Sequence, residues 1–148
     1  MQSPDNPRCF AAAYEAKAQG LCERLQACLE EEGTCPERIE AALRELSNFA
    51  TEDPLATKAL FVEVHFAGGA ALAMRRELMD RIAQTIEDVC DEPAFEGVSP
   101  LTTEFVIGVV EQAVVRTVTL ETPEKLREIA PELATILSRL WARGPGSL

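Results

Sequence analysis

The chain has 148 residues, and its 14 Lys and Arg against 25 Asp and Glu give a formal net charge of −11. Hydrophobic residues make up 47% and charged residues 26%, which is typical of a globular chain rather than of a disordered or fibrous one. A chain of this length can bury one core without disulfide or metal staples. Because nucleic-acid affinity depends largely on Lys and Arg that neutralise phosphates, the acidic balance predicts that this chain alone binds no DNA or RNA.

The amino-terminal residues and the cysteines indicate a cytoplasmic protein. Residues 1–7 are polar and interrupted by prolines, unlike a signal peptide. The longest uncharged, strongly apolar run, 64–74, is well short of the ~18 residues that a membrane span needs, so we expect no membrane contact. The five cysteines form no C-x-x-C pair and the chain has one histidine, so we expect reduced thiols, no metal site and no cofactor.

The first two predicted helices follow from apolar spacing and from their end signals. Apolar residues recur at steps of three, four and seven over about 10–32, and Gly33 suits the end of that helix. Thr34 and Glu37 then have the spacing of a capping box, in which each side chain accepts a hydrogen bond from the other residue's backbone N–H. The stripe behind this box predicts a second helix to about residue 50.

The remaining helices are predicted mainly from their first residues. Three pairs place a capping side chain before a proline suited to the first helical turn: Asp53-Pro54, Ser99-Pro100 and Thr122-Pro123. Together with a break at Gly68-Gly69, they predict helices near 54–67, 70–91, 100–120 and 123–142, with a loop over 91–98. Because no period-2 pattern is sustained, no strand is expected, and the predicted fold class is all-α with six helical segments.

Proline also marks an expected interruption near the carboxyl end. Pro131 cannot donate to the carbonyl of Arg127 and its ring clashes there, so we expect a break or kink at about 129–131. The expected organisation is one domain over 9–142, with disordered ends at 1–8 and 143–148.

The segment 101–120 differs from the other helices because its apolar residues occupy nearly every direction around the axis. A helix that is apolar all round must be buried all round, which predicts either a two-fold dimer through the last two helices or a monomer with a covered central helix. The predicted four-helix dimer interface uses one set of residues from each helix: Val106, Val110, Ala113, Val114 and Thr117, with Leu133, Ile136, Leu137, Leu140 and Trp141.

Two carboxylates lie inside apolar runs. Glu63 and Glu111 are costly to bury unless they are paired, so each predicts a basic partner or a cavity with a polar ligand group. The candidate partners are Arg75, Arg76 and Arg116. The chain has no G-x-S-x-G, H-E-x-x-H or glycine-rich phosphate motif, so we expect no enzymatic activity.

Three segments in this order resemble the carboxy-terminal half of tetracycline-repressor-like (TetR-like) transcriptional regulators. They are Phe10–Ala16, Leu60–Gly69 followed by Arg75-Arg76-Glu77, and Glu128–Ala134 closing on Leu140-Trp141. The resemblance covers about residues 8–142 and implies an effector-binding and homodimerising domain. The basic helix-turn-helix that precedes this domain in the family is missing from the sequence. In the family, a small and often lipophilic effector enters a cavity among the middle helices.

The resemblance implies a cavity with an apolar and aromatic lining and a few polar handles. The candidate ligand-binding residues are Tyr14, Phe61, Glu63, His65, Phe66, Met74, Met79 and Phe105. Each of these could equally be an ordinary core or rim residue. The alternative function is a stand-alone helical interaction protein that binds no DNA and pairs with a full-length relative.

Overall fold

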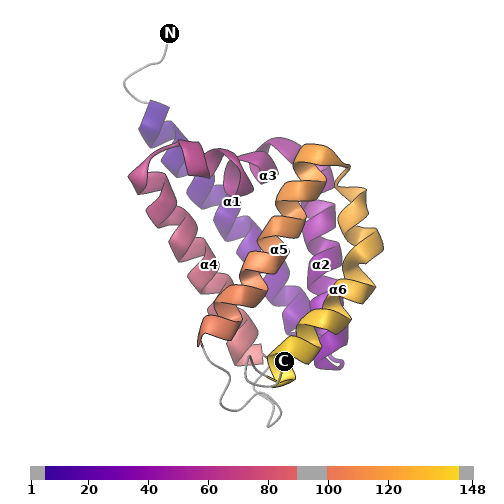
Figure 1. Ribbon diagram of the computed structural model, residues 1–148. Helices are drawn as coiled ribbons and strands as arrows, with labels where there is room; N and C mark the ends of the chain where they lie inside the picture. Colours follow the sequence, from indigo (N-terminus) through magenta and orange to yellow (C-terminus); the bar gives the residue numbers. More distant parts are fainter. Residues whose placement is uncertain (1–5, 90–99, 144–148) are drawn as a thin grey trace.

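The computed structural model describes residues 6–89 and 100–143, and the side chains of 9–88 and 101–140. Within these ranges the chain is helical with no strand, which confirms the predicted all-α class. The elements are α1 (Asn6–Leu29), α2 (Cys35–Glu52), α3 (Pro54–Phe61), the 3₁₀ turn η1 (Glu63–Phe66), α4 (Gly69–Val89), α5 (Pro100–Leu120) and α6 (Glu124–Arg143) (Figure 1). The side chain of Trp141, the predicted loop 91–98, Cys90, Ser99 and the segments 1–5 and 144–148 lie outside the described residues.

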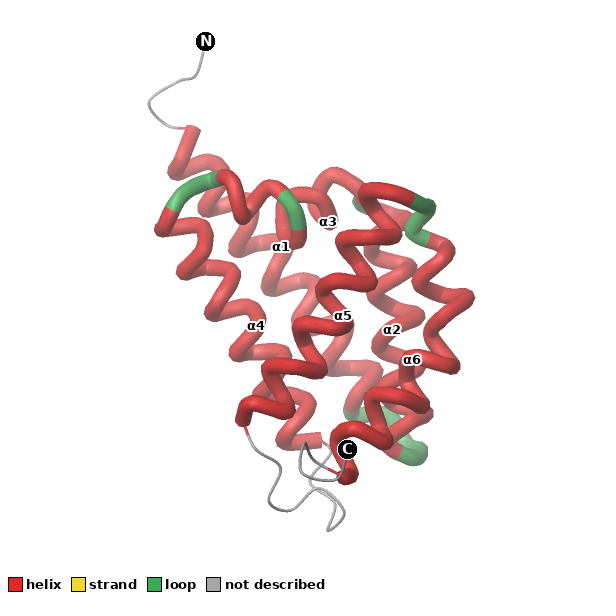
Figure 2. The backbone as a smooth tube through the Cα atoms, in the orientation of Figure 1, coloured by secondary structure: helices red, strands yellow, loops and turns green. Residues whose placement is uncertain are grey.

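The helices pack as a bundle in which α5 crosses the front, with α4 and α6 on either side and α1 and α2 behind (Figures 1 and 2). Helix α2 packs most extensively against α6 and α1, while α5 packs against α6 and α3. The Ser47 hydroxyl donates to the Pro123 carbonyl at 2.9 Å and so ties α2 to the first turn of α6.

The predicted capping box opens α2. The Thr34 N–H donates to Glu37 Oε2 at 2.9 Å, and the Glu37 N–H donates to Thr34 Oγ1 at 3.4 Å. Gly33 has a φ of +143°, and a Cβ there would lie 2.7 Å from Glu37 Oε2. Glycine therefore supplies both the backbone conformation and the space that this cap needs.

Helix α1 begins earlier and ends earlier than the apolar stripe predicts. It starts at Asn6 rather than near residue 10, because Pro7 suits the first turn of a helix. It ends at Leu29 rather than near Glu32, and the next residues form a turn before the Thr34 cap.

The predicted helix over 54–67 is wrong in its second half. Asp53 caps α3 by accepting the Ala56 N–H at 3.1 Å, but α3 ends at Phe61 and a 3₁₀ turn follows. β-Branched residues and the glycine pair beyond them have low helix propensity. The tighter turn lets Phe61 and Val64 both pack into the core while the chain reverses into α4.

The expected break at Pro131 does not occur, because α6 is continuous through it. Pro131 is exposed, so the Arg127 carbonyl can bond water in place of the missing N–H. Buried residues on both sides, including Leu126 and Leu137, anchor the helix to the core. The helix curves along its length in Figure 2 instead of stopping.

The core covers more of α5 than its composition predicts. Val106 and Val114 are 2% and 0% exposed, and Thr117 and Leu137 are also buried by their own chain. These four predicted interface residues are therefore covered by helices of their own chain, and Val106 and Leu137 share one buried cluster with residues of α2 and α6. What remains uncovered on α5 is a narrower stripe that includes Leu101 and Phe105.

Candidate ligand-binding site

An apolar cavity of about 60 Å³ lies among five helices, and we call it the central cavity. Its lining side chains are all apolar: Leu25, Leu29, Ile39, Ala42, Leu43, Leu46, Ile82, Ile86, Val106, Val110 and Leu137. Ordered water in a protein interior needs two to four polar partners, and no lining side chain offers one. The central cavity can therefore accept an apolar molecule but holds water poorly.

A second hollow of about 200 Å³ lies on the surface between α4 and α5, and we call it the α4–α5 groove. Its lining includes apolar side chains and charged ones: Arg75, Arg76, Met79, Asp80, Ala83, Glu104, Ile107, Gly108 and Glu111. On each helix the lining residues lie one, three or four positions apart and so share one face of that helix. Apolar and charged side chains both occur along that face. The groove can thus contact both an apolar body and a polar group.

Two ion pairs join the helices across this groove. Arg75 binds both carboxylate oxygens of Glu111, whose side chain is only 13% exposed. Arg76 binds Glu104 at 2.8 Å where both side chains are largely exposed. The prediction that Glu111 has a basic partner is confirmed.

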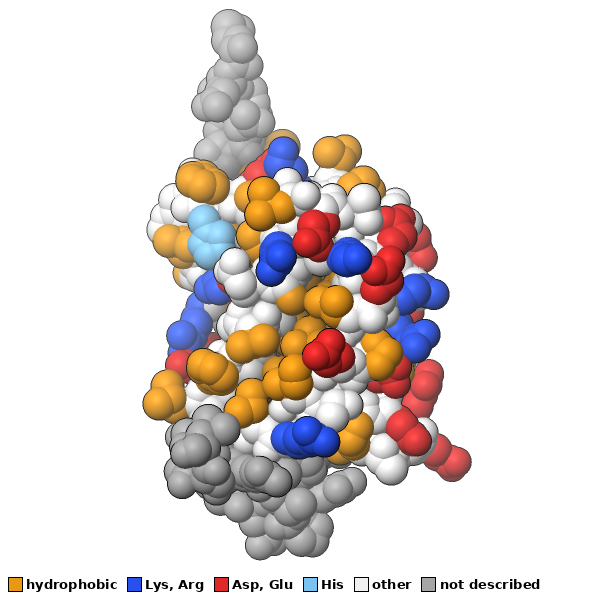
Figure 3. Space-filling view, turned by 45° about the vertical axis from the view of Figure 1, so that its right-hand side comes forward, with side chains coloured by type: hydrophobic (Ala, Val, Ile, Leu, Met, Phe, Trp, Pro, Cys, Tyr) orange, Lys and Arg blue, Asp and Glu red, His pale blue; other side chains and the backbone are white. Residues whose placement is uncertain are grey.

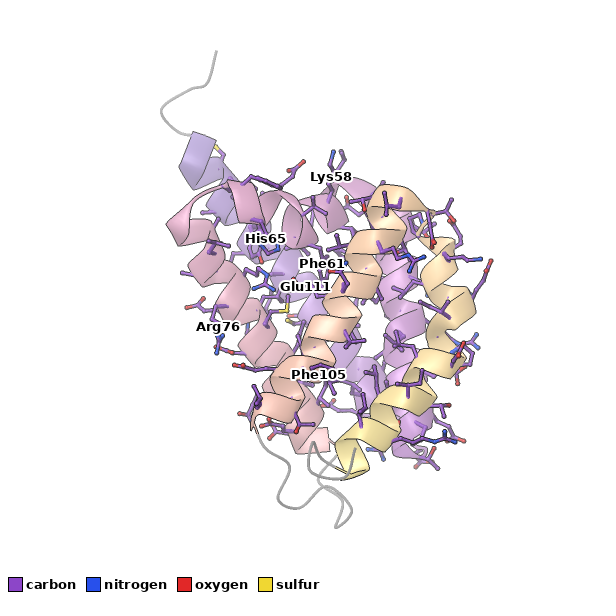
Figure 4. The ribbon with its side chains drawn as sticks, viewed as in Figure 1. Lys58, Phe61, His65, Arg76, Phe105 and Glu111 are labelled. Atoms are coloured by element: carbon purple, nitrogen blue, oxygen red, sulfur yellow. The ribbon has the colours of Figure 1, made fainter. Side chains whose placement is uncertain are left out.

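His65 lies at the edge of the Arg75–Glu111 ion pair. His65 Nε2 is 3.7 Å from Glu111 Oε1, and its side chain is 40% exposed. Figure 4 shows His65, Phe61 and Glu111 on neighbouring elements, η1, α3 and α5 respectively. The lone histidine therefore fits the expected rim position beside a carboxylate.

Glu63 does not behave as its apolar neighbours predict. It lies in η1 with an exposed side chain, whereas the adjacent Val64 is fully buried. The expectation of a buried carboxylate at Glu63 is wrong, because a 3₁₀ turn directs successive side chains about 120° apart and places this one in water.

Two buried polar atoms near the Arg75–Glu111 pair have no hydrogen-bond partner among the described residues: the Tyr14 hydroxyl and Arg75 Nε. Burial raises the pKa of Tyr14 to about 12; Arg75 lowers that pKa and Glu111 raises it. The charges of both Arg75 and Glu111 therefore act on the pKa of Tyr14. Unpaired buried donors cost free energy, so this is a polar cluster with unused hydrogen-bonding capacity.

We predict that the stability of the fold falls above pH 10 because of Tyr14. The folded-state pKa of about 12 lies above the ordinary tyrosine value of 10.0, so the unfolded chain releases this proton first. Between those pH values unfolding gains about 2–3 kcal/mol from Tyr14. Tyr14 is the only tyrosine, so tyrosinate absorbance reads its pKa directly.

The matched variant for this measurement is Tyr14→Phe, which keeps the ring. Its urea unfolding is expected to lack the part of the alkaline slope that the tyrosine contributes, while other groups titrate as in the wild type. A wild-type absorbance midpoint near 10 in the folded protein would show instead that the Tyr14 hydroxyl is hydrated.

The structure brings some of the predicted ligand-binding residues together and separates others. Tyr14, Phe61 and Met79 belong to one core cluster, with Met74 packed against it. Phe66 is 86% exposed and Phe105 59% exposed, so with Glu63 they lie at the surface. None of the eight lines the central cavity, and Met79 alone lines the α4–α5 groove.

The central cavity was not predicted from the sequence. Its residues each occupy the inner stripe of a helix, so their burial could be foreseen. Whether five such stripes meet without a gap depends on distances between helices, and the sequence pattern carries no signal for that.

The two partly buried cysteines of α1, Cys22 and Cys28, are held in the thiol form. Burial raises the pKa of Cys22 and of Cys28, which suppresses the reactive thiolate form. Across residues 6–89 and 100–143, no group of three or more His, Cys, Asp and Glu side chains is placed to hold a metal ion.

Among the described helices, none combines the length and apolarity that crossing a membrane requires. No protein-family model, no curated protein and no solved structure matches the chain.

Proposed function

We propose that this chain is a ligand-sensing and dimerising domain of a regulatory protein, similar in role to the effector domains of TetR-like regulators. In this proposal it binds a small apolar molecule in the central cavity and, within an intact regulator, controls DNA binding by a separate head. The observation that supports the proposal is the cavity itself, about 60 Å³ with only apolar side chains around it.

Because the central cavity is small, binding of a ligand there would be coupled to a movement of the helices that line it. An apolar cavity of about 150 Å³ holds one benzene molecule and stays dry otherwise, so a ring-sized ligand needs more room than the central cavity has. Such a ligand must therefore push apart the helices that line it, including α4 at Ile82 and α5 at Val110. A ligand that favours a wider spacing shifts the population of helix positions, which is the physical basis of an effector response.

We predict that methylcyclohexane stabilises the wild type and that the cavity-filling variant Ala42→Leu abolishes this effect. Ala42 lines the cavity, and three added carbon atoms occupy the space. A ligand that binds only the folded state at ten times its Kd raises the melting temperature by ~4 °C for a domain of this size.

The control is Ala27→Leu, the same exchange at an exposed position of α1. It is expected to keep the full thermal shift with methylcyclohexane. Equal shifts in wild type and Ala42→Leu would place the ligand elsewhere and remove the central cavity as the site.

The second part of the proposal is a two-fold homodimer through the uncovered stripe of α5. Apolar side chains run through the middle of the face shown in Figure 3. The stripe has Leu101 and Leu120 at its ends, Phe105 and Arg116 one turn inside, and Gly108 and Gln112 in the middle. An antiparallel two-fold contact pairs each position of the stripe with the position counted from its other end, so Leu101 meets the partner's Leu120. In that arrangement each Phe105 ring lies against the partner's Arg116.

The alternative, a stand-alone protein that pairs with a full-length relative, uses the same stripe. A relative with a matching stripe would bind it equally well. Ligand binding distinguishes the two functions, because the stand-alone partner needs none.

A further inference from the structure

We infer that the α4–α5 groove is a second binding site, for an uncharged molecule that presents a ketone, ester or amide oxygen to Arg75. This goes beyond the proposed function, which concerns an apolar ligand in the central cavity. The two hollows use different residues of α4 and α5, so each can be tested alone.

The groove has the room and the apolar surface for the body of such a molecule. Its volume of about 200 Å³ exceeds the ~150 Å³ that holds benzene in an apolar cavity. Met79, Ala83 and Ile107 supply the apolar contact. Methionine is flexible and polarizable, so Met79 can adapt to more than one shape.

Arg75 supplies the polar contact. Its guanidinium has five N–H donors, and within the described part of the chain only Nη2 has an acceptor, the Glu111 carboxylate. The Arg75 side chain lines the groove and is 26% exposed, so it can be reached from there. Because Nε is buried, a molecule in the groove would reach the terminal guanidinium nitrogens, and a carbonyl oxygen, which only accepts hydrogen bonds, would pair an unused N–H there.

The charges in the groove exclude the ionised alternatives. Two arginines against Asp80, Glu104 and Glu111 give 2 − 3 = −1, in a chain of net charge −11, so an anion is repelled. A cation has no acceptor for Arg75 and would compete with it for Glu111. An uncharged molecule with an acceptor oxygen is not repelled by the groove and does not compete with Arg75 for Glu111.

The test compares three probes of similar shape: cyclohexanone, methylcyclohexane and cyclohexanecarboxylate. The chain has three methionines, so labelling the methionine methyls with ¹³C gives few NMR signals, and Met79 reports from inside the groove. The Kd read at Met79 is expected to be about 10-fold lower for cyclohexanone than for methylcyclohexane, the gain of one hydrogen bond to a charged donor. It is also expected to be lower than for cyclohexanecarboxylate, which the negative charge of the groove repels.

Arg75→Lys keeps a positive charge beside Glu111 but removes the guanidinium fork. It is expected to erase the advantage of cyclohexanone, whereas the neighbouring exchange Arg76→Lys is expected to leave it intact. Because Arg75→Lys also touches a structural pair, Ala83→Leu provides an independent check by filling the groove from α4. Its control is Ala73→Leu at an exposed position of the same helix.

The outcomes separate this inference from the proposed function. Loss of Met79 shifts in Ala83→Leu together with loss of ketone preference in Arg75→Lys supports the groove site, even if methylcyclohexane fails to enter the central cavity. Three results would overturn the groove site: equal Kd values for cyclohexanone and methylcyclohexane at Met79, a ketone preference that survives Arg75→Lys, or no binding at Met79. None of these results would contradict thermal stabilisation by methylcyclohexane, which tests the central cavity.

Discussion

Replacing Glu111 with leucine is expected to lower the free energy of unfolding by about 3 kcal/mol, although one charge is simply removed. Arg75 would then keep its positive charge at a site where only 26% of its side chain is exposed and Glu111 is its only ion-pair partner among the described residues. Taking one partner out of a mostly buried pair leaves the other charge desolvated and uncompensated. Urea unfolding followed by far-ultraviolet circular dichroism measures the loss at a fixed protein concentration.

The double variant Arg75→Met with Glu111→Leu is expected to recover most of that loss. Replacing both partners with apolar side chains leaves no buried charge behind, so the two substitutions should be strongly non-additive. Arg76→Met with Glu104→Leu is the matched pair, since it also bridges α4 and α5 but is 65% and 57% exposed. Its members are each expected to cost less than about 1 kcal/mol. Additive losses at Arg75 and Glu111 would contradict a coupled pair.

Replacing Phe105 with arginine is expected to convert a dimer into a monomer without unfolding the chain. Phe105 is 59% exposed in the single chain, so the fold does not depend on it. In the proposed dimer, the substitution would bring a second positive charge against the partner's Arg116 at both symmetry-related contacts, and like charges in contact across an interface cost several kcal/mol. Light scattering coupled to size-exclusion chromatography gives the mass at micromolar concentration.

The control for the dimer is Leu55→Arg, which introduces the same charge at a side chain 80% exposed on α3. It is expected to remain a dimer, because α3 lies outside the α5 stripe. A wild-type chain that is monomeric at micromolar concentration removes the dimer, and equal dissociation by both variants removes α5 as its interface.

The sequence predicts the elements well where local signals are strong. The Thr34–Glu37 box and the Asp53 cap are decided within four residues, so α2 and α3 begin where they are expected to. Of the break or kink predicted at Pro131, the break is wrong, because packing on both sides of the proline outweighs its local cost. The 3₁₀ turn after Phe61 also depends on how the chain enters the core, which local spacing does not reveal.

The site was less predictable for a related reason. The partner of Glu111 could be narrowed to three arginines from the pattern alone, and the structure selects Arg75. Composition could not tell that α5 is covered at Val106 and open at Phe105, because both are apolar and one residue apart on the chain. The central cavity arises where five helices fail to meet, and that depends on tertiary distances rather than on residue type.

The most direct test of the account is whether an apolar molecule enters the central cavity. Methylcyclohexane can be titrated into protein carrying ¹³C-labelled isoleucine, leucine and valine methyl groups. The account predicts saturable shifts at cavity-lining methyls such as Ile82 and Val110, and none at those positions in Ala42→Leu. Saturable shifts confined to surface methyls such as Leu55 and Leu120, or no saturable shift at all, would contradict it.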